Sequence, residues 1–148
     1  MSYITTNLNK SVLFISKDLE QLQGQCPSYE MYEVGTGGHM INISDADFNL
    51  LVTGEKMVIV NNDLSVTLRD PIGNISSKEE LDTIISDIKK KITRVLPFKK
   101  DGSFKNELIA YKTLLENLDT SSISFPIVSL EKYLKDQNQP FLNSLQIC

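Results

Sequence analysis

The only histidine of the chain, His39, follows the glycine-rich stretch Gly35-Thr36-Gly37-Gly38. Such a stretch could cradle a phosphate, and a histidine beside it could act as a general base. A dinucleotide-binding loop has the form G-x-G-x-x-G before a helix, whereas here only the first two glycines match and residues 39–43 alternate like a strand. A P-loop would need a lysine and then a serine or threonine at the start of the helix. The stretch is therefore predicted to be a structural turn that needs positive φ.

Other polar residues that could do chemistry have structural explanations. Asp45 and Asp47 could bind Mg²⁺ or Ca²⁺, but two aspartates in a first helical turn fit the positive end of the helix dipole. Glu79 and Glu80 could form an acid and base pair, but they follow Ser77 at the spacing of a helix cap. A serine hydrolase would show a G-x-S-x-G elbow. The sequence thus predicts no catalytic residue, no metal site and no cofactor, with an enzyme of unrecognised type as an open alternative.

The composition predicts a single acidic domain. The chain has 148 residues, a net charge of -4 and a pI near 5.0. This balance argues against a nucleic-acid partner, so the run Lys89-Lys90-Lys91 is interpreted as a solvated helix face. Cys26 and Cys148 lack metal-site spacing, and no disulfide is predicted. Residues 1–16 do not fit a signal peptide, and no run approaches the roughly 18 apolar residues of a membrane helix, so no membrane contact is expected.

The first part of the chain alternates short strand-like stretches with turns. The glycine-rich turn would join the strands on either side of it as a hairpin, and Ser44 would cap a helix that Gly54 ends. Asn61-Asn62-Asp63 would form a second hairpin turn, because these residues tolerate positive φ. The predicted elements are strands at residues 11–16, 30–34, 39–43, 56–60 and 64–70, a helical turn at 17–25 and a helix at 44–54, which together make a small α+β unit over residues 1–71.

The second part has the period of helices. Ser77 and Glu80 match a capping box, apolar residues then recur at steps of three and four, and Pro97 ends the helix. A second striped helix follows the turn at Asp101-Gly102, so an antiparallel helical hairpin is predicted. Residues 77–148 would hold this hairpin, a short helix at 129–137 and an extended apolar tail at 141–148, which could serve as a peptide for a partner. The two units are expected to pack as one compact domain.

The two apolar stripes carry more apolar surface than a helical hairpin can bury by itself. The α+β unit could cover one side, so part of the surface is expected to meet another chain, either a second copy or a different partner. The residues predicted for this interface are Ile85, Ile88, Ile92, Tyr111, Leu115 and Leu118.

Two motifs lie in order along residues 41–126. The first has the form I-x-I-[ST]-D-x-x-[FYH]-x-x-L-x-x-G and precedes a hairpin that ends near a proline. The second has the form Y-[RK]-x-x-L-x-x-[LI] and precedes an F-P pair. The matching residues are Ile41, Ile43, Ser44, Asp45, Phe48, Leu51, Gly54 and Pro71 in the first, and Tyr111, Lys112, Leu115, Leu118, Phe125 and Pro126 in the second.

With these motifs the chain resembles phage tail-fibre assembly and tail-assembly-chaperone-like proteins. The resemblance implies a non-catalytic protein that binds other virion proteins during tail or fibre assembly, in the host cytoplasm or in the virion. A small inhibitor or adaptor that binds a host protein is an open alternative to this expectation.

Overall fold

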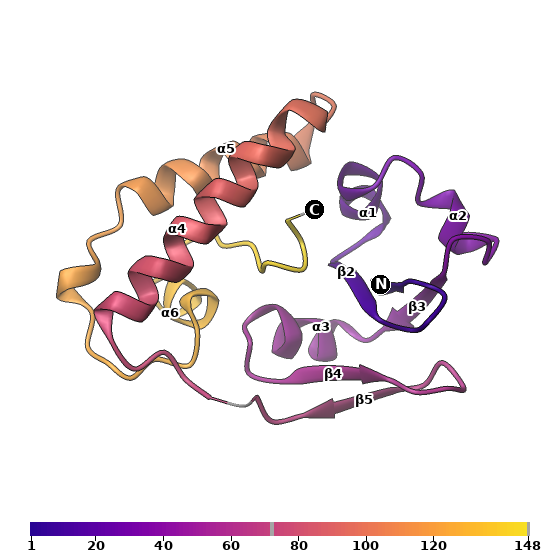
Figure 1. The fold of residues 1–148 in the computed structure, drawn as a ribbon, viewed down its shortest axis with the longest axis horizontal. Helices are drawn as coiled ribbons and strands as arrows, with labels where there is room; N and C mark the ends of the chain where they lie inside the picture. The colour runs from indigo at the N-terminus through magenta and orange to yellow at the C-terminus, as the bar shows by residue number, and fades with distance from the viewer. Residues whose placement is uncertain (72, 148) are drawn as a thin grey trace.

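The computed structural model describes residues 1–71 and 73–147 and has the predicted α+β fold (Figure 1). Its N-terminal half, residues 1–71, contains an antiparallel three-stranded sheet in the order β2-β1-β3. The central strand is β1 (Ser2–Thr6), which pairs with β2 (Val12–Ser16) on one side and β3 (His39–Ile43) on the other. The sequence analysis did not predict β1, whose threonines are buried beside Ile4.

The hairpin predicted around the glycine-rich stretch is wrong. Residues 30–34 do not form a strand, because α2 (Glu30–Glu33) is a single helical turn there. Strand β3 pairs instead with β1, with His39 opposite Thr6. The predicted positive φ is confirmed at Gly35 and Gly38, with values of 78° and 149°. A Cβ on Gly38 would lie 1.8 Å from the Thr6 carbonyl oxygen, so glycine lets the chain enter β3 directly against β1.

Two other helices of the N-terminal half begin at side-chain caps. The first, α1 (Leu19–Gln25), starts after Asp18, which accepts a hydrogen bond from the Gln21 N–H. The second, α3 (Asp45–Val52), starts after Ser44, as predicted, and the Ser44 hydroxyl oxygen accepts from the Asp47 N–H at 3.1 Å. Both helices therefore start where a short polar side chain satisfies a free backbone donor.

Replacing Ser44 with alanine is expected to lower the free energy of unfolding by about 1 kcal/mol, because the Asp47 N–H loses its acceptor. Denaturant unfolding monitored by circular dichroism measures this change. Ala46→Ser in the same turn is the control, since Ala46 is exposed and caps nothing. No change for Ser44→Ala would mean that this cap does not stabilise α3.

The N-terminal half has its own apolar core. Strands β4 (Met57–Val60) and β5 (Val66–Arg69) form the second predicted hairpin, although Leu64, with a φ of 67°, takes the positive value expected of an asparagine. This hairpin and α3 pack on the three-stranded sheet. The buried residues of this core are Ile4, Ile15, Ile43, Phe48, Leu51 and Val52.

The helical half, residues 77–148, has the predicted hairpin of α4 (Lys78–Val95) and α5 (Ser103–Glu116), joined through the 3-10 turn η1 (Leu96–Phe98). Ser77 caps α4 through the Glu80 N–H, but the Glu80 carboxylate accepts from the N–H of Ser76 rather than that of Ser77. A second 3-10 turn, η2 (Thr120–Ser122), leads to α6 (Leu130–Asp136), whose cap is Ser129. The predicted short helix near residues 129–137 is thus present.

The C-terminal tail is packed inside the molecule rather than offered to a partner. It runs between the helical hairpin and the sheet (Figure 1, yellow). Leu142 is 5% exposed and Ile147 is fully buried in the core of the helical half. The Leu145 carbonyl accepts a hydrogen bond from the Ile15 N–H on the open edge of β2. The expectation of a free peptide is therefore wrong for residues 141–147, and Cys148 lies outside the described residues.

Candidate functional site

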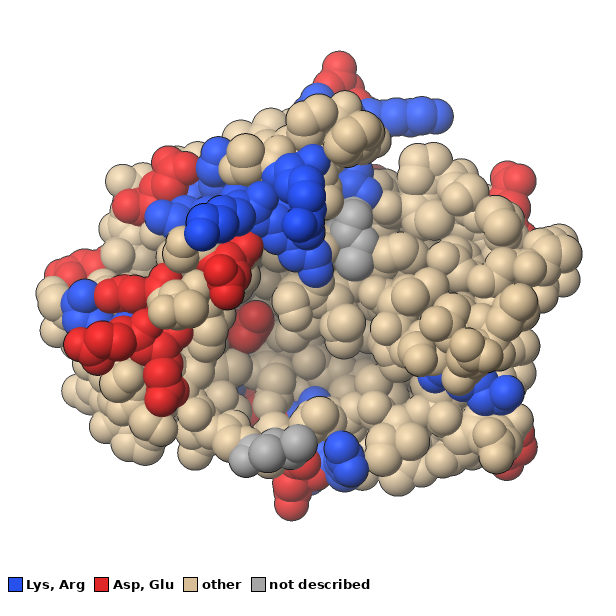
Figure 2. All heavy atoms as spheres, in the orientation of Figure 1, with Lys and Arg blue, Asp and Glu red and all other residues tan. Residues whose placement is uncertain are grey.

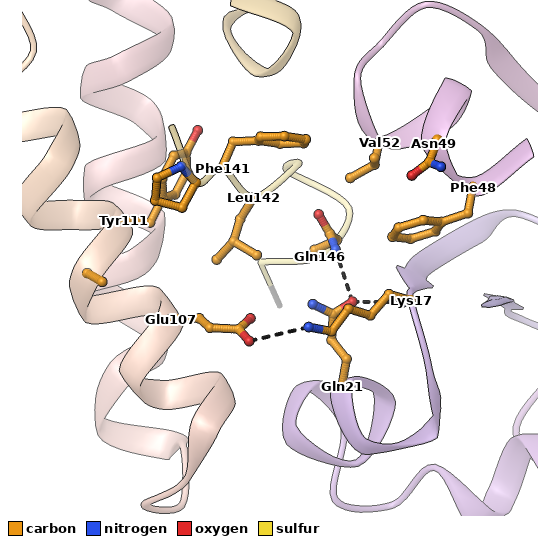
Figure 3. Close-up of a pocket in the computed structure, with 12 residues that line it drawn as sticks. Lys17, Gln21, Phe48, Asn49, Val52, Glu107, Tyr111, Phe141, Leu142 and Gln146 are labelled. Atoms are coloured by element: carbon orange, nitrogen blue, oxygen red, sulfur yellow. Dashed lines mark hydrogen bonds and ion pairs between the residues drawn. The ribbon is translucent and has the colours of Figure 1, made fainter. Parts of the chain in front are cut away.

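A pocket of about 430 Å³ lies where the two halves of the chain meet (Figure 3). The N-terminal half contributes the end of β2 together with α1 and α3, and the helical half contributes α5 and the tail. The pocket therefore exists only in the assembled fold. Its lining residues are Lys17, Gln21, Phe48, Asn49, Val52, Glu107, Ala110, Tyr111, Pro140, Phe141, Leu142 and Gln146.

One end of the pocket is polar and internally paired. The Lys17 ammonium lies 3.7 Å from a Glu107 carboxylate oxygen, and both side chains are partly exposed. Gln21 Oε1 accepts hydrogen bonds from the Lys17 N–H and from Gln146 Nε2, each at 2.9 Å (Figure 3). Since Gln21 and Gln146 are almost fully buried, these bonds hold β2, α1 and the tail in fixed positions.

The other end of the pocket is apolar. Phe48 and Val52 come from α3, while Phe141 and Leu142 come from the tail on the opposite wall (Figure 3). Phe141 packs against the apolar cores of both halves. An apolar wall beside a few fixed polar groups is the usual character of a binding pocket, because the wall supplies burial and the polar groups set orientation.

Tyr111, which lines the pocket, and Glu131, whose charge acts on it, are two buried polar groups. Tyr111 is 2% exposed, and its hydroxyl makes no hydrogen bond, although the Leu142 N–H lies near enough to influence it. Burial, and secondarily the charge of Glu131, raises the pKa of Tyr111 far above its usual range. Burial also raises the pKa of the Glu131 carboxyl, and its own N–H and the Ser129 hydroxyl offset this only in part. Both groups are thus held towards their neutral forms.

The raised pKa of Glu131 predicts a pH dependence of stability. The folded chain holds the Glu131 proton more tightly than the unfolded chain, whose pKa is near 4.5. The stabilising contribution is complete below that value and is lost as pH rises through the folded pKa. Glu131→Gln is therefore expected to gain stability relative to wild type as pH rises from 4.5 to neutrality.

Urea unfolding between pH 4.5 and neutrality measures the effect as the difference in free energy of unfolding between wild type and Glu131→Gln. Glu116→Gln is the control, because it makes the same substitution on the exposed face of α5. A free-energy difference for Glu131→Gln that does not change with pH would mean that Glu131 is not desolvated.

A smaller pocket of about 240 Å³ adjoins the first and shares Lys17, Gln21 and Glu107 with it. Its remaining lining comes from α1 and its cap, namely Asp18 and Glu20, and from the first turns of α5. The two pockets lie next to each other along the junction of the halves, and together they are called here the junction groove. One end of this groove is apolar and the other carries carboxylates.

The predicted interface residues lie inside the chain. Ile85, Ile88 and Ile92 of α4 are at most 6% exposed, and Tyr111 and Leu115 of α5 are at most 3% exposed. Leu118 is half-buried and lies beyond the end of α5. The short helix and the tail were predicted, but not that they fold back over the hairpin and bury its apolar stripes. These five buried residues are not available to a partner in this fold, although Tyr111 contributes to the wall of the larger pocket.

The other residues considered for chemistry lie apart from the junction groove. His39 is half-buried in β3. The Asp45 carboxylate accepts a hydrogen bond from the Ser2 hydroxyl, and the Glu80 carboxylate accepts one from the Ser76 N–H. Within residues 1–71 and 73–147, no three His, Cys, Asp or Glu side chains gather in a way that could hold a metal ion. The same part of the chain contains no helix that is both long and apolar enough to span a membrane.

A basic surface covers the last turns of α4 (Figure 2). It surrounds a shallow hollow between α4 and α5 that is lined by Lys89, Lys90, Arg94 and Lys112. Lys112 lies 3.9 Å from Glu116, while the other three form no ion pair with any described residue. Of the run predicted as a solvated helix face, Lys90 is exposed, whereas Lys91 is half-buried and its ammonium donates to the Ser144 carbonyl of the tail.

Most residues of the junction groove were missed by the sequence analysis. Phe48 was named only as a position of the first motif, and Lys17 and Glu107 stand 90 positions apart. In the sequence, Lys17 and Glu107 are polar residues beside apolar stretches, a pattern that is common in any chain and does not indicate a site. Comparisons with protein-family models, with curated proteins and with solved structures find no match to this chain.

Proposed function

We propose that this protein is a non-catalytic binding protein of phage-type virion or tail assembly that holds a segment of a partner protein in the junction groove. The observation that carries the proposal is the groove itself, which combines apolar walls from Phe48 and Phe141 with polar groups already fixed by mutual bonds. The motifs shared with tail-assembly proteins across residues 41–126 support the assembly role.

The arrangement of the polar groups favours recognition over reaction. Nucleophilic catalysis needs a nucleophile within hydrogen-bond reach of a base. In the junction groove, Lys17 is paired with Glu107, and the Gln21 and Gln146 amides bond to each other. Such groups can orient the backbone or a side chain of a bound segment, and the surrounding apolar surface can supply the free energy of binding.

The groove also has room for a partner without unfolding the chain. A cavity of about 430 Å³ falls within the 300–1,000 Å³ typical of ligand pockets. Its rim carries the exposed residues Asn49 and Ala110, one on each side. A segment could therefore enter from solvent and displace only water from the apolar end.

Blocking the groove is expected to abolish partner capture. In Ala110→Trp, a large ring is placed at an exposed rim position, so it should fill the pocket while the chain stays folded. Affinity capture from lysate of phage-infected host cells, followed by identification of the bound proteins, compares this variant with wild type. We expect wild type to retain virion proteins. Ala110→Trp should retain at least about tenfold less of them, as expected when a main contact of an interface is lost.

The matched control is Ile109→Trp, at the neighbouring exposed position of α5 that does not line the groove. It should capture partners as wild type does. Equal capture by Ala110→Trp and wild type would contradict the proposal, because the groove would then be dispensable. Capture of a host protein alone, from uninfected cells as well, would favour a host-binding inhibitor or adaptor instead.

A further inference from the structure

The smaller pocket of the junction groove has a negative lining. Asp18, Glu20 and Glu107 contribute three carboxylates, whereas among the residues that the structure describes one cation, Lys17, lines it. Each carboxylate already has one neighbour: Asp18 accepts from the Gln21 N–H, Glu20 accepts from the Ser103 hydroxyl at 3.0 Å, and Glu107 lies beside Lys17. A carboxylate has about four acceptor sites, so these contacts leave capacity for a further donor.

Two cations near this pocket, Lys99 and Lys17, already have partners. The Lys99 ammonium lies 5.5 Å from the centre of the Phe104 ring and donates to the Gln25 carbonyl, so it is drawn towards the buried side of α1. Lys17 is shared by both pockets and sits at their boundary. The acidic end is therefore suited to a cation, and the neighbouring apolar end to an uncharged side chain.

We propose that the segment held in the junction groove carries an apolar side chain, which fills the pocket between Phe48 and Phe141, and close to it in sequence a basic side chain, which enters the acidic pocket beside Glu20 and Glu107. This proposal rests on the proposed function and specifies the partner by charge complementarity. An arginine suits the acidic pocket better than a lysine, because its planar group can donate to two carboxylates at once.

Short peptides test this chemistry without knowledge of the partner. The probes are acetylated and amidated Gly-Ser peptides that carry Phe and Arg separated by one, two or three residues. Matched peptides replace Arg with Glu, or Phe with Ala. Binding to the full ¹⁵N-labelled chain is followed by chemical-shift titration, and the Gln21 and Gln146 side-chain amides report on the groove itself.

We expect a Phe and Arg peptide to bind, with shifts at the groove amides. Replacing Arg with Glu should weaken binding about three- to tenfold at low salt, an effect that shrinks in about 0.5 M NaCl because the charges are partly exposed. Replacing Phe with Ala should weaken it at least about tenfold, since the apolar burial is lost. Ala110→Trp should remove binding, Glu107→Gln should reduce the preference for Arg, and Ile109→Trp should change neither.

The inference is overturned if no Phe and Arg peptide binds at millimolar concentration, or if the Glu peptides bind as well as or better than the Arg peptides. Its failure differs from failure of the proposed function. If Ala110→Trp blocks partner capture from lysate but the peptides show no preference for Arg, the groove holds a partner of other chemistry. If Ala110→Trp captures partners normally, the proposed function fails whatever the peptides do.

Discussion

Ile85→Asp is expected to unfold the chain rather than to leave a folded protein that has lost a partner. Ile85 is 6% exposed in the core of the helical half, where its neighbours are the apolar side chains of α4, α5, α6 and the tail. An aspartate there must either bury a charge without a partner or open the core to water, and either outcome costs more than about 4 kcal/mol. This loss is a large part of the 5–15 kcal/mol that stabilises a typical domain.

Circular dichroism and urea unfolding measure the effect, and light scattering monitors association. The matched control is Thr83→Asp, which places the same charge on the exposed face of α4 and should shift stability by no more than about 0.5 kcal/mol. A folded Ile85→Asp protein that differs from wild type only in its association would contradict the structure. It would restore the expectation that the apolar stripes of the hairpin form an interface.

Ile147→Ala is expected to destabilise the chain by about 2–5 kcal/mol, the usual result for truncating a large side chain in a closed core. Ile147 is fully buried, although it stands second to last in the sequence. The residue before it ties the tail to the N-terminal half, because the Gln146 carbonyl accepts from Gln25 Nε2 and its side chain donates to Gln21. Loss of packing at Ile147 should therefore also loosen the walls of the junction groove.

Denaturant unfolding measures this loss, with Ser144→Ala as the control, because the Ser144 side chain is exposed and only its carbonyl is used, by Lys91. Hydrogen exchange at the Ile15 N–H, which donates to Leu145, gives a second measurement of tail docking. An effect of Ile147→Ala below about 0.5 kcal/mol, the size typical of surface positions, would show that the tail is free. The tail could then act as a peptide for a partner, as the sequence alone suggested.

Polar contacts of the tail hold the two halves together, so the shape of the junction groove depends on how the tail is docked. Lys91 donates to the Ser144 carbonyl from the helical half, and Asn143 donates to the Val52 carbonyl of the N-terminal half. The tail thus bonds to both halves within a few residues. A partner that fills the apolar pocket contacts Phe141 and Leu142 of this tail, so binding is expected to stabilise the junction of the halves as well.

The sequence by itself determined the elements whose causes are local. Ser44, Ser77 and Ser129 begin their helices because a short hydroxyl side chain can satisfy a backbone donor within the next three residues. The stripe from Leu81 to Val95 defined α4 because helical periodicity repeats over about four turns. In each case the residues that define the element are within about one helical turn of the next one in the sequence. No knowledge of distant contacts was needed to predict these elements.

The tertiary structure decided which surfaces meet. Strand β3 could pair with residues 30–34 or with β1, and the choice depended on Gly38 approaching the Thr6 backbone, a contact that no local pattern encodes. The stripes of α4 and α5 were correctly recognised as apolar, but what covers them is a tail some 30 residues further along the chain. The junction groove arises from the same long-range packing, because Lys17 and Glu107 become neighbours only once the two halves have docked.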